Sequence, residues 1–293
     1  MSPTSYLREV LRAQQVQPDS PEMKALRSAR SDIEALIEQS FSDCSPTVRY
    51  GGSKMKNTMN LEDYDLDIIN YFPRTDTRAG GTIKEIYHNV AAALRTKYQV
   101  EERTTALRVR DADRDLKIDV VPGRFTDNTN TFAYVHQKDG PKPYLQTYLD
   151  RHIEFVRDSG CTEEIRLAKL WRPCAGIKIR TFPLELVVIK ILGGSRLRDL
   201  DDRMTYLLTE IRDCIATIAI EDPANSGNDL SSCLDGATRS ALALGARTTL
   251  NTVAQSGWSP VFRAVMDAEL SARQAVHRIS VIRNEERTPP WAL

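Results

Sequence analysis

The sequence predicts an α+β chain in which a mixed β-sheet comes first and a helical part follows. Residues 65–72 are a β-forming run that starts at its acids, and apolar and polar residues alternate along 115–121, the period expected of a strand. Later in the chain the pattern becomes helical, and the nearly all-apolar stretch 181–192 ends at two glycines, which is typical of a buried helix. We therefore expect a sheet-containing part at 1–150 and a helical part at 151–293.

Helix caps and strand periods set the order of the elements. Ser20 and Pro21 suit the N-cap and first position of a helix with an apolar stripe from Leu26 to Phe41, which we expect to brace both parts of the chain. The other expected elements are strands at 48–50, 65–72, 100–110, 115–121 and 131–136, and helices at 81–98, 181–192, 197–218, 234–255 and 260–282. The last residues, 284–293, are polar and then Pro-rich, which indicates an extended tail where a regulatory protein could dock.

Composition narrows the classes of partner. The chain has 40 basic and 40 acidic residues, whereas a protein that tracks a long duplex usually has a basic excess or a basic stripe. The richest basic cluster alternates with acids, so we interpret it as a solvated sheet face rather than a nucleic-acid groove; it comprises Arg103, Arg108, Arg110, Arg114 and Lys117. We expect small nucleotides, not a long nucleic acid, as the substrate.

The lengths of the apolar stretches and the spacing of the cysteines indicate the cellular compartment. No apolar stretch approaches the roughly 20 residues that span a bilayer, so we expect no membrane partner. The five cysteines show no paired spacing, which argues against a disulfide framework and a zinc ribbon. A reducing cytoplasm fits best.

Three aspartates stand on two of the expected strands. The strand period of two places Asp65 and Asp67 on one face, and Asp119 faces away from the apolar residues at 116, 118 and 120. Two carboxylates on the same strand face raise each other's pKa unless a cation neutralises them. The pair therefore most naturally holds Mg²⁺. Three such groups can bridge two metals about 4 Å apart. The alternative is an ordinary solvated strand edge.

A turn of small residues precedes the first two aspartates. Gly51, Gly52 and Ser53 follow a short strand, and small residues there let backbone N–H groups approach an anion. Lys54 and Lys56 bring positive charge, which suits a triphosphate. A Gly-Gly turn alone is more often a hairpin or a helix cap. The order is more specific: a strand, Gly-Ser, a helical turn, and Asp-x-Asp after eleven intervening residues.

This arrangement resembles a DNA polymerase β-type nucleotidyltransferase. That superfamily has Gly-Ser, about ten residues, an apolar-flanked Asp-x-Asp and a third Asp on a later strand. Gly52, Ser53, Asp65, Asp67 and Asp119 match it residue by residue. The resemblance implies a bilobal fold with a mixed-sheet catalytic lobe and a helical, oligoadenylate synthetase-like lobe.

One position departs from the pattern. Relatives commonly carry Gly before the Thr of this loop, and the chain has Asn57. Asn tolerates a positive φ better than most residues, so a similar loop is still expected.

Motifs in the helical part narrow the resemblance. The matching segments follow the order of the cyclic GMP-AMP synthase-like and oligoadenylate synthetase-like enzymes, and they are 164–171 (with Arg-x-x-Lys-x-Trp), 182–186 and 221–228. By this resemblance Lys169 would contact the donor's terminal phosphates, against the alternative of a solvated helix lysine. We expect Trp171 to be core packing rather than a stacking platform.

The chain is thus similar to the CD-NTase family of bacterial CBASS antiphage systems. The resemblance implies that nucleoside triphosphates, ATP or GTP, are joined with release of pyrophosphate into a cyclic di- or trinucleotide, a second messenger for a separate effector protein. Asp65, Asp67 and Asp119 would be catalytic and hold two Mg²⁺ or Mn²⁺ ions. Gly52, Ser53, Lys56 and Lys169 would bind the donor phosphates. Base, linkage and ring size stay open.

Two other functions are compatible with the same motifs. A CCA-type enzyme that adds nucleotides to an RNA 3′ end shares the motifs, but such relatives carry long RNA-binding domains for which this chain has no room. A non-catalytic nucleotide-binding scaffold is disfavoured because all three carboxylates are present.

Overall fold

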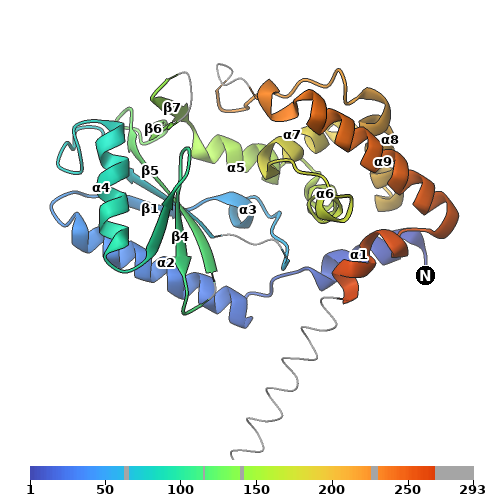
Figure 1. Cartoon of the computed structure of the whole chain (residues 1–293), viewed down its shortest axis with the longest axis horizontal. Helices are drawn as coiled ribbons and strands as arrows, with labels where there is room; N and C mark the ends of the chain where they lie inside the picture. The colour runs from blue at the N-terminus through green and yellow to red at the C-terminus, as the bar shows by residue number, and fades with distance from the viewer. Residues whose placement is uncertain (63–65, 115, 139–141, 226–229, 268–293) are drawn as a thin grey trace, which may run out of the picture.

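The computed structural model describes residues 1–62, 66–114, 116–138, 142–225 and 230–267. A β-sheet covered by helices forms one lobe, and a bundle of helices forms the other (Figure 1). The two largest apolar cores correspond to these lobes, and a third, smaller cluster lies on the sheet. In the described segments, no helix has both the length and the apolarity required to cross a bilayer.

All seven described strands belong to one mixed sheet. They are β1 (Thr47–Tyr50), β2 (Leu66–Phe72), β3 (Gln99–Glu102), β4 (Leu107–Asp111), β5 (Leu116–Phe125), β6 (Ala133–His136) and β7 (Tyr144–Thr147). The order is β1-β2-β5-β4-β3, with β6 and β7 continuing from β5. The central β2–β5 pair is parallel and the other pairs are antiparallel. The two strands that carry the predicted aspartates are therefore direct neighbours.

Helices α2 (Pro21–Ser40) and α4 (Ile83–Arg95) pack against the sheet. Ser20 caps α2 as expected, since its side chain accepts a hydrogen bond from the Met23 N–H and Pro21 takes a first-turn position. Apolar side chains of both helices and of β2 and β5 share one fully buried core, with Ile33, Ile86, Ile68, Ile118 and Val120 all at 0% exposure. On the opposite face a smaller apolar cluster covers the far ends of β2 and β5, and the end that carries Asp67 and Asp119 faces the cleft.

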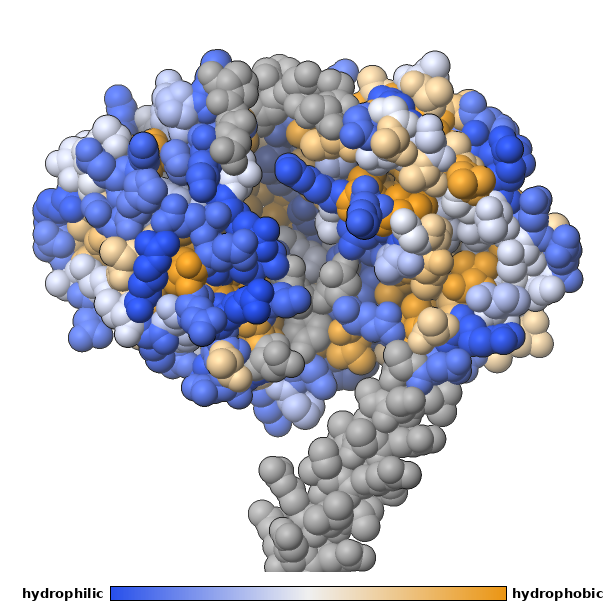
Figure 2. All heavy atoms as spheres, in the orientation of Figure 1, coloured by the Kyte–Doolittle hydropathy of each residue, from blue (hydrophilic) through white to orange (hydrophobic). Residues whose placement is uncertain are grey.

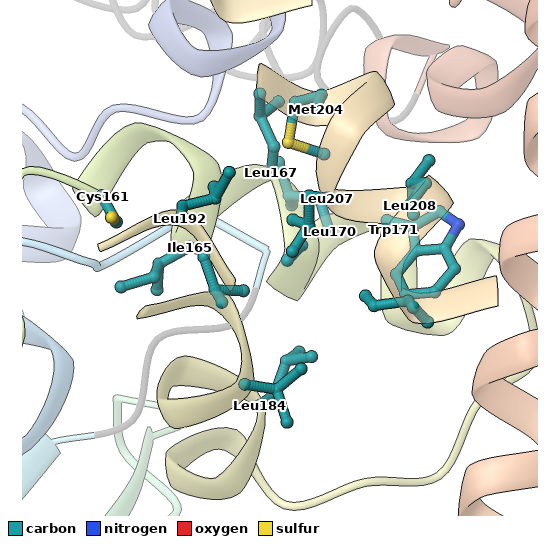
Figure 3. Packing of buried hydrophobic residues seen from close by; sticks show 14 of the residues in the cluster. Cys161, Ile165, Leu167, Leu170, Trp171, Leu184, Leu192, Met204, Leu207 and Leu208 are labelled. Atoms are coloured by element: carbon teal, nitrogen blue, oxygen red, sulfur yellow. The ribbon is translucent and has the colours of Figure 1, made fainter. Parts of the chain in front are cut away.

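The second lobe is a helical bundle around a large core. It contains α1 (Pro3–Ala13), α5 (Leu149–Arg157), α6 (Thr162–Cys174), α7 (Thr181–Leu192), α8 (Leu200–Cys214), a 3₁₀ turn at Ser231–Leu234 and α9 (Gly236–Ser256). Side chains of α6, α7 and α8 meet in this core (Figure 3). Trp171 is 1% exposed and its indole N–H donates to Thr249 Oγ1 at 2.8 Å, which confirms that it is core packing.

The structure differs from the sequence expectations near the N-terminus. Helix α1 was not expected, and its residues Leu7 and Val10 lie in the helical core. Helix α2 instead packs in the core of the sheet lobe. The expectation that α2 braces both parts of the chain is therefore wrong. Helix α1 packs in the helical lobe and helix α2 in the sheet lobe (Figure 1).

Two further elements differ. The expected strand 100–110 is a hairpin, β3 and β4, closed by a hydrogen bond from the Arg103 N–H to the Ala106 carbonyl at 2.9 Å. Strand β7 was not among the expected strands, and it adds an edge to the sheet beside β6. Of the expected helix 260–282, residues beyond 267 lie outside the described part, as does the tail 284–293.

Candidate active site

A cleft of about 510 Å³ lies between the lobes. It is lined from the sheet lobe by Gly52, Ser53, Lys56, Asp67, Arg108 and Asp119, and from the helical lobe by Lys169, Arg172, Arg180, Thr181, Phe182 and Glu185. Figure 2 shows a hollow between the lobes, with hydrophilic residues on the sheet-lobe side and both hydrophilic and hydrophobic residues on the helical-lobe side. Of the predicted site residues, Gly52, Ser53, Lys56, Asp67, Asp119 and Lys169 thus meet in one cleft, whereas Asp65 lies outside the described residues.

Asp67 and Asp119 are brought together by the parallel pairing of β2 and β5. They are register partners on neighbouring strands. The flanking Leu66, Ile68 and Val120 point into the core and are at most 2% exposed. Because successive strand side chains alternate between faces, the buried neighbours turn both carboxylates toward the cleft.

The glycine turn packs directly on one of these carboxylates. Gly51 N–H donates to the Asp67 carbonyl at 2.9 Å, and Gly52 follows with φ 59° at the start of the short helix α3 (Gly52–Met55). A Cβ on Gly52 would lie 1.6 Å from Asp67 Oδ2, so this position has no space for a side chain. Asn57 has φ 59°, which confirms the expectation that it tolerates a positive φ in this loop.

Asp119 makes a two-pronged ion pair with Arg108. The guanidinium Nη2 donates to Oδ2 at 2.6 Å and its Nε donates to Oδ1. Arg108 is the direct cross-strand partner of Asp119 on β4, and the two side chains are 22% and 18% exposed. The interpretation of the basic cluster as a wholly solvated face is therefore wrong for Arg108, although Arg110 is exposed.

The other two predicted cations lie in contacts that join the lobes. Lys56 Nζ is 2.8 Å from Glu185 Oε2, and Thr58 Oγ1 donates to Glu185 Oε1 at 3.1 Å. Lys169 Nζ donates to the Thr58 carbonyl at 2.9 Å. Lys169 is only 2% exposed, so the alternative of a solvated helix lysine is wrong. Both lysines reach the cleft wall while linking its two sides.

Sequence reasoning missed several cleft residues. Arg180 is the exposed N-cap of α7, Thr181 and Phe182 begin that helix, and Phe182 lies under the Lys56 ammonium at 4.5 Å. Arg172 donates to the Ile179 carbonyl at 2.9 Å. The segment 182–186 was singled out only as the start of a buried helix; an arginine and a hydroxyl just before it were the available signal for a polar cleft wall.

The cleft fits a divalent cation in its donor chemistry. Carboxylates are preferred by Mg²⁺ and Mn²⁺, and Asp67 and Asp119 adjoin on one face. Because Gly52 has no side chain, the position beside Asp67 Oδ2 that a Cβ would occupy stays clear of one. Within the described ranges no group of three acidic, His or Cys residues gathers, and the third predicted aspartate, Asp65, lies outside them.

Solved structures with a similar fold come from bacterial enzymes. The Bradyrhizobium diazoefficiens CD-NTase CdnG in complex with GTP aligns with a TM-score of 0.71 at 13% identity, covering 93% of this chain and 99% of that one. CdnC of Escherichia coli MS115-1, in complex with HORMA-deltaN, has a TM-score of 0.63 at 17% identity, with 90% and 95% covered. The chain has the CD-NTase fold.

The Vibrio cholerae DncV cyclic AMP-GMP synthase, with a nonhydrolyzable GTP, aligns with a TM-score of 0.60 at 16% identity and covers 87% of this chain and 76% of that one. No protein-family model and no curated protein matches the sequence. The CD-NTase fold predicted from the motifs is thus confirmed by shape, across sequences that are largely different.

Proposed function

We propose that this protein is a metal-dependent nucleotidyltransferase that joins nucleoside triphosphates into a cyclic di- or trinucleotide. The observation that carries the proposal is the pairing of Asp67 and Asp119 on neighbouring strands, beside a glycine turn and a cleft lined with basic side chains. Three solved structures of the same fold are named as cyclic dinucleotide, cyclic di-GMP and cyclic AMP-GMP synthases, which supports the choice of product.

In this proposal the sheet wall positions the reacting groups. An acceptor hydroxyl attacks the donor α-phosphorus, the bond to pyrophosphate breaks, pyrophosphate leaves, and the hydroxyl proton passes to solvent. Two Mg²⁺ or Mn²⁺ ions, held by Asp67, Asp119 and Asp65, would acidify the hydroxyl and neutralise the leaving group. Asp119 faces the acceptor, and the backbone of Gly52 with the Ser53 hydroxyl cradles the donor phosphates.

The helical wall supplies positive charge to the triphosphate. Lys169, Arg172 and Arg180 line the cleft from α6 and the start of α7. Lys56 lies opposite them on the sheet lobe, next to Glu185. Catalysis here is positioning and electrostatic stabilisation, because phosphoryl transfer needs no covalent intermediate on the protein. After the first joining, the linear product would re-enter the cleft and close.

The biological setting follows from the same proposal. The product would diffuse in the cytoplasm to a separate effector protein in CBASS antiphage defence. One structural neighbour is a complex with HORMA-deltaN, which supports a regulatory protein partner for this chain as well. The C-terminal tail is the proposed place for that partner.

The test is a product assay with the purified full-length chain. The four nucleoside triphosphates are incubated with Mg²⁺ or Mn²⁺, and the products are treated with phosphatase. Cyclic species lack terminal phosphates, so the proposal expects small phosphatase-resistant products. Label found only at a tRNA 3′ end would favour the CCA-type alternative, and nucleotide binding without turnover would favour the scaffold.

A further inference from the structure

The Arg108–Asp119 pair lies at the point where acceptor chemistry is proposed. Both oxygens of the Asp119 carboxylate accept hydrogen bonds from the same guanidinium, through Nε and Nη2. The two parallel N–H groups of a guanidinium form a fork that binds the two carboxylate oxygens, and a metal would bind the same oxygens. Arg108 itself lines the cleft.

Strand pairing makes this contact more than a chance surface pair. Arg108 and Asp119 are direct register partners on β4 and β5, so their Cα atoms are held opposite each other. The side chains are 22% and 18% exposed, which weakens solvent screening. On the other side of β5, Asp67 is the register partner of Asp119. Asp119 therefore has a cation on one flank and a carboxylate on the other.

We infer that Arg108 competes with the divalent cation for Asp119, so that this metal position is filled only when an anion in the cleft draws the guanidinium away. The phosphate groups of a nucleotide are such an anion, since a guanidinium binds phosphate with the same fork that binds a carboxylate. Nucleotide binding and metal binding at Asp119 then favour each other, as linkage requires. This inference rests on the proposed function.

The consequence is an order of events. Before a nucleotide is bound, Asp119 is neutralised by Arg108 and a metal there is disfavoured. After binding, Arg108 holds phosphate and Asp119 is released for the metal that activates the acceptor hydroxyl. Arg108 acts here as a positioning residue. Its effect is that Asp119 becomes available to a metal only once phosphate is in the cleft.

Mn²⁺ binding to the full-length chain without nucleotide tests the competition directly. We expect Arg108→Gln to bind Mn²⁺ about tenfold more tightly than the unmodified chain, within the usual range of coupling between two sites. Arg108→Lys keeps the charge without the fork and should fall between them. Arg110→Gln is the matched control, because Arg110 is exposed on the same strand and is not among the cleft-lining residues.

A second substitution tests whether the tighter Mn²⁺ binding depends on the Asp119 carboxylate. Adding Asp119→Asn to Arg108→Gln should remove the tighter binding. A gain that persists in the double variant would place the effect elsewhere and overturn the inference. So would a folded Arg108→Gln chain, checked by circular dichroism and thermal melting, that binds Mn²⁺ no more tightly than the unmodified chain.

Sulfate provides a test that does not depend on any variant folding. It mimics phosphate and binds Mn²⁺ weakly in solution. Sodium sulfate, compared with sodium chloride at equal ionic strength, should tighten Mn²⁺ binding to the unmodified chain. No change in Mn²⁺ affinity would contradict the inference. Neither titration uses catalysis, so a chain that forms no product but shows the Asp119-dependent competition would refute the proposed function alone.

Discussion

The two walls of the cleft are built in different ways. On the sheet wall, Asp67, Asp119 and Gly52 are placed by strand pairing and a tight turn. On the helical wall, Lys169 and Glu185 are charged residues buried to 2% and 1% exposure, and they bond across the cleft to the segment that follows α3. The difference suggests that the sheet wall carries the chemistry, while the helical wall also holds the lobes together.

The largest expected effect is on the sheet wall. Asp67→Asn should lower the rate of nucleotide joining by about a thousandfold or more, since the carboxylate is proposed to hold both metals. Removing one of several neighbouring negative charges should leave the fold intact or slightly more stable. Product formation and thermal melting measure the two effects.

Asp113→Asn is the matched control for this change, because Asp113 is an exposed carboxylate in the turn before β5. It should change neither quantity. Undiminished joining by well-folded Asp67→Asn would remove the sheet wall from the chemistry.

Gly52→Ala should reduce activity by about a hundredfold, the size expected when a reacting group is displaced by about 1 Å. The added Cβ would meet Asp67 Oδ2, at 1.6 Å in the present geometry. Gly176→Ala separates this clash from backbone strain, since Gly176 has φ 67° and nothing within 4 Å of the new carbon. Gly176→Ala should lose about 1–2 kcal/mol of stability through backbone strain, Gly52→Ala should lose more because of the clash, and only Gly52→Ala should lose activity. Equal activity of the two would show that the Asp67 carboxylate needs no fixed position.

On the helical wall, the expected effect is on stability. Glu185→Ala leaves Lys56 without its carboxylate and Thr58 without its acceptor. Breaking a buried ion pair costs about 3 kcal/mol, which urea unfolding can measure. The exposed pair Arg212–Asp213 is the comparison, and Asp213→Ala should leave the unfolding midpoint unchanged. Equal midpoints for the two variants would mean that Glu185 does not hold the lobes together.

A smaller effect is expected at Lys169. Lys169→Met should weaken triphosphate binding about tenfold, equivalent to roughly 1.5 kcal/mol for one charged contact. Lys178→Met, at an exposed lysine, should leave affinity unchanged. Titration with a non-hydrolysable ATP analogue measures both. If Lys169→Met binds the analogue as tightly as the unmodified chain, Lys169 does not bind phosphate and serves only to hold the lobes together.

The face on which each sheet-wall residue lies could be predicted from sequence because it is set locally, whereas the pairing of β2 with β5 joins distant parts of the chain. A period of two places Asp119 opposite the core residues, and a glycine before Asp-x-Asp marks the close approach of the turn to the carboxylates. The helical wall depends on contacts across more than a hundred positions, such as Lys169 to Thr58, which are 111 residues apart. No periodicity encodes such a pairing.

Arg108 shows the same limit within the sheet. Its charge alternates with acids, which fits a solvated strand face, and only the β4–β5 register places it beside Asp119. Helix α1 was also missed. Its signals were nevertheless local: Ser2 caps it and Pro3 takes a first-turn position, as Ser20 and Pro21 do for α2.

The central claim is that the sheet-wall carboxylates join nucleotides into a ring. Mass spectrometry of the phosphatase-treated products, from the unmodified chain and from Asp119→Asn at matched fold content, tests it most directly. From the unmodified chain we expect products whose mass is the sum of two or three nucleoside monophosphates minus one water for each. From Asp119→Asn we expect no such product above background. Equal amounts of cyclic product from both proteins, or only linear and RNA-linked products from the unmodified one, would contradict it.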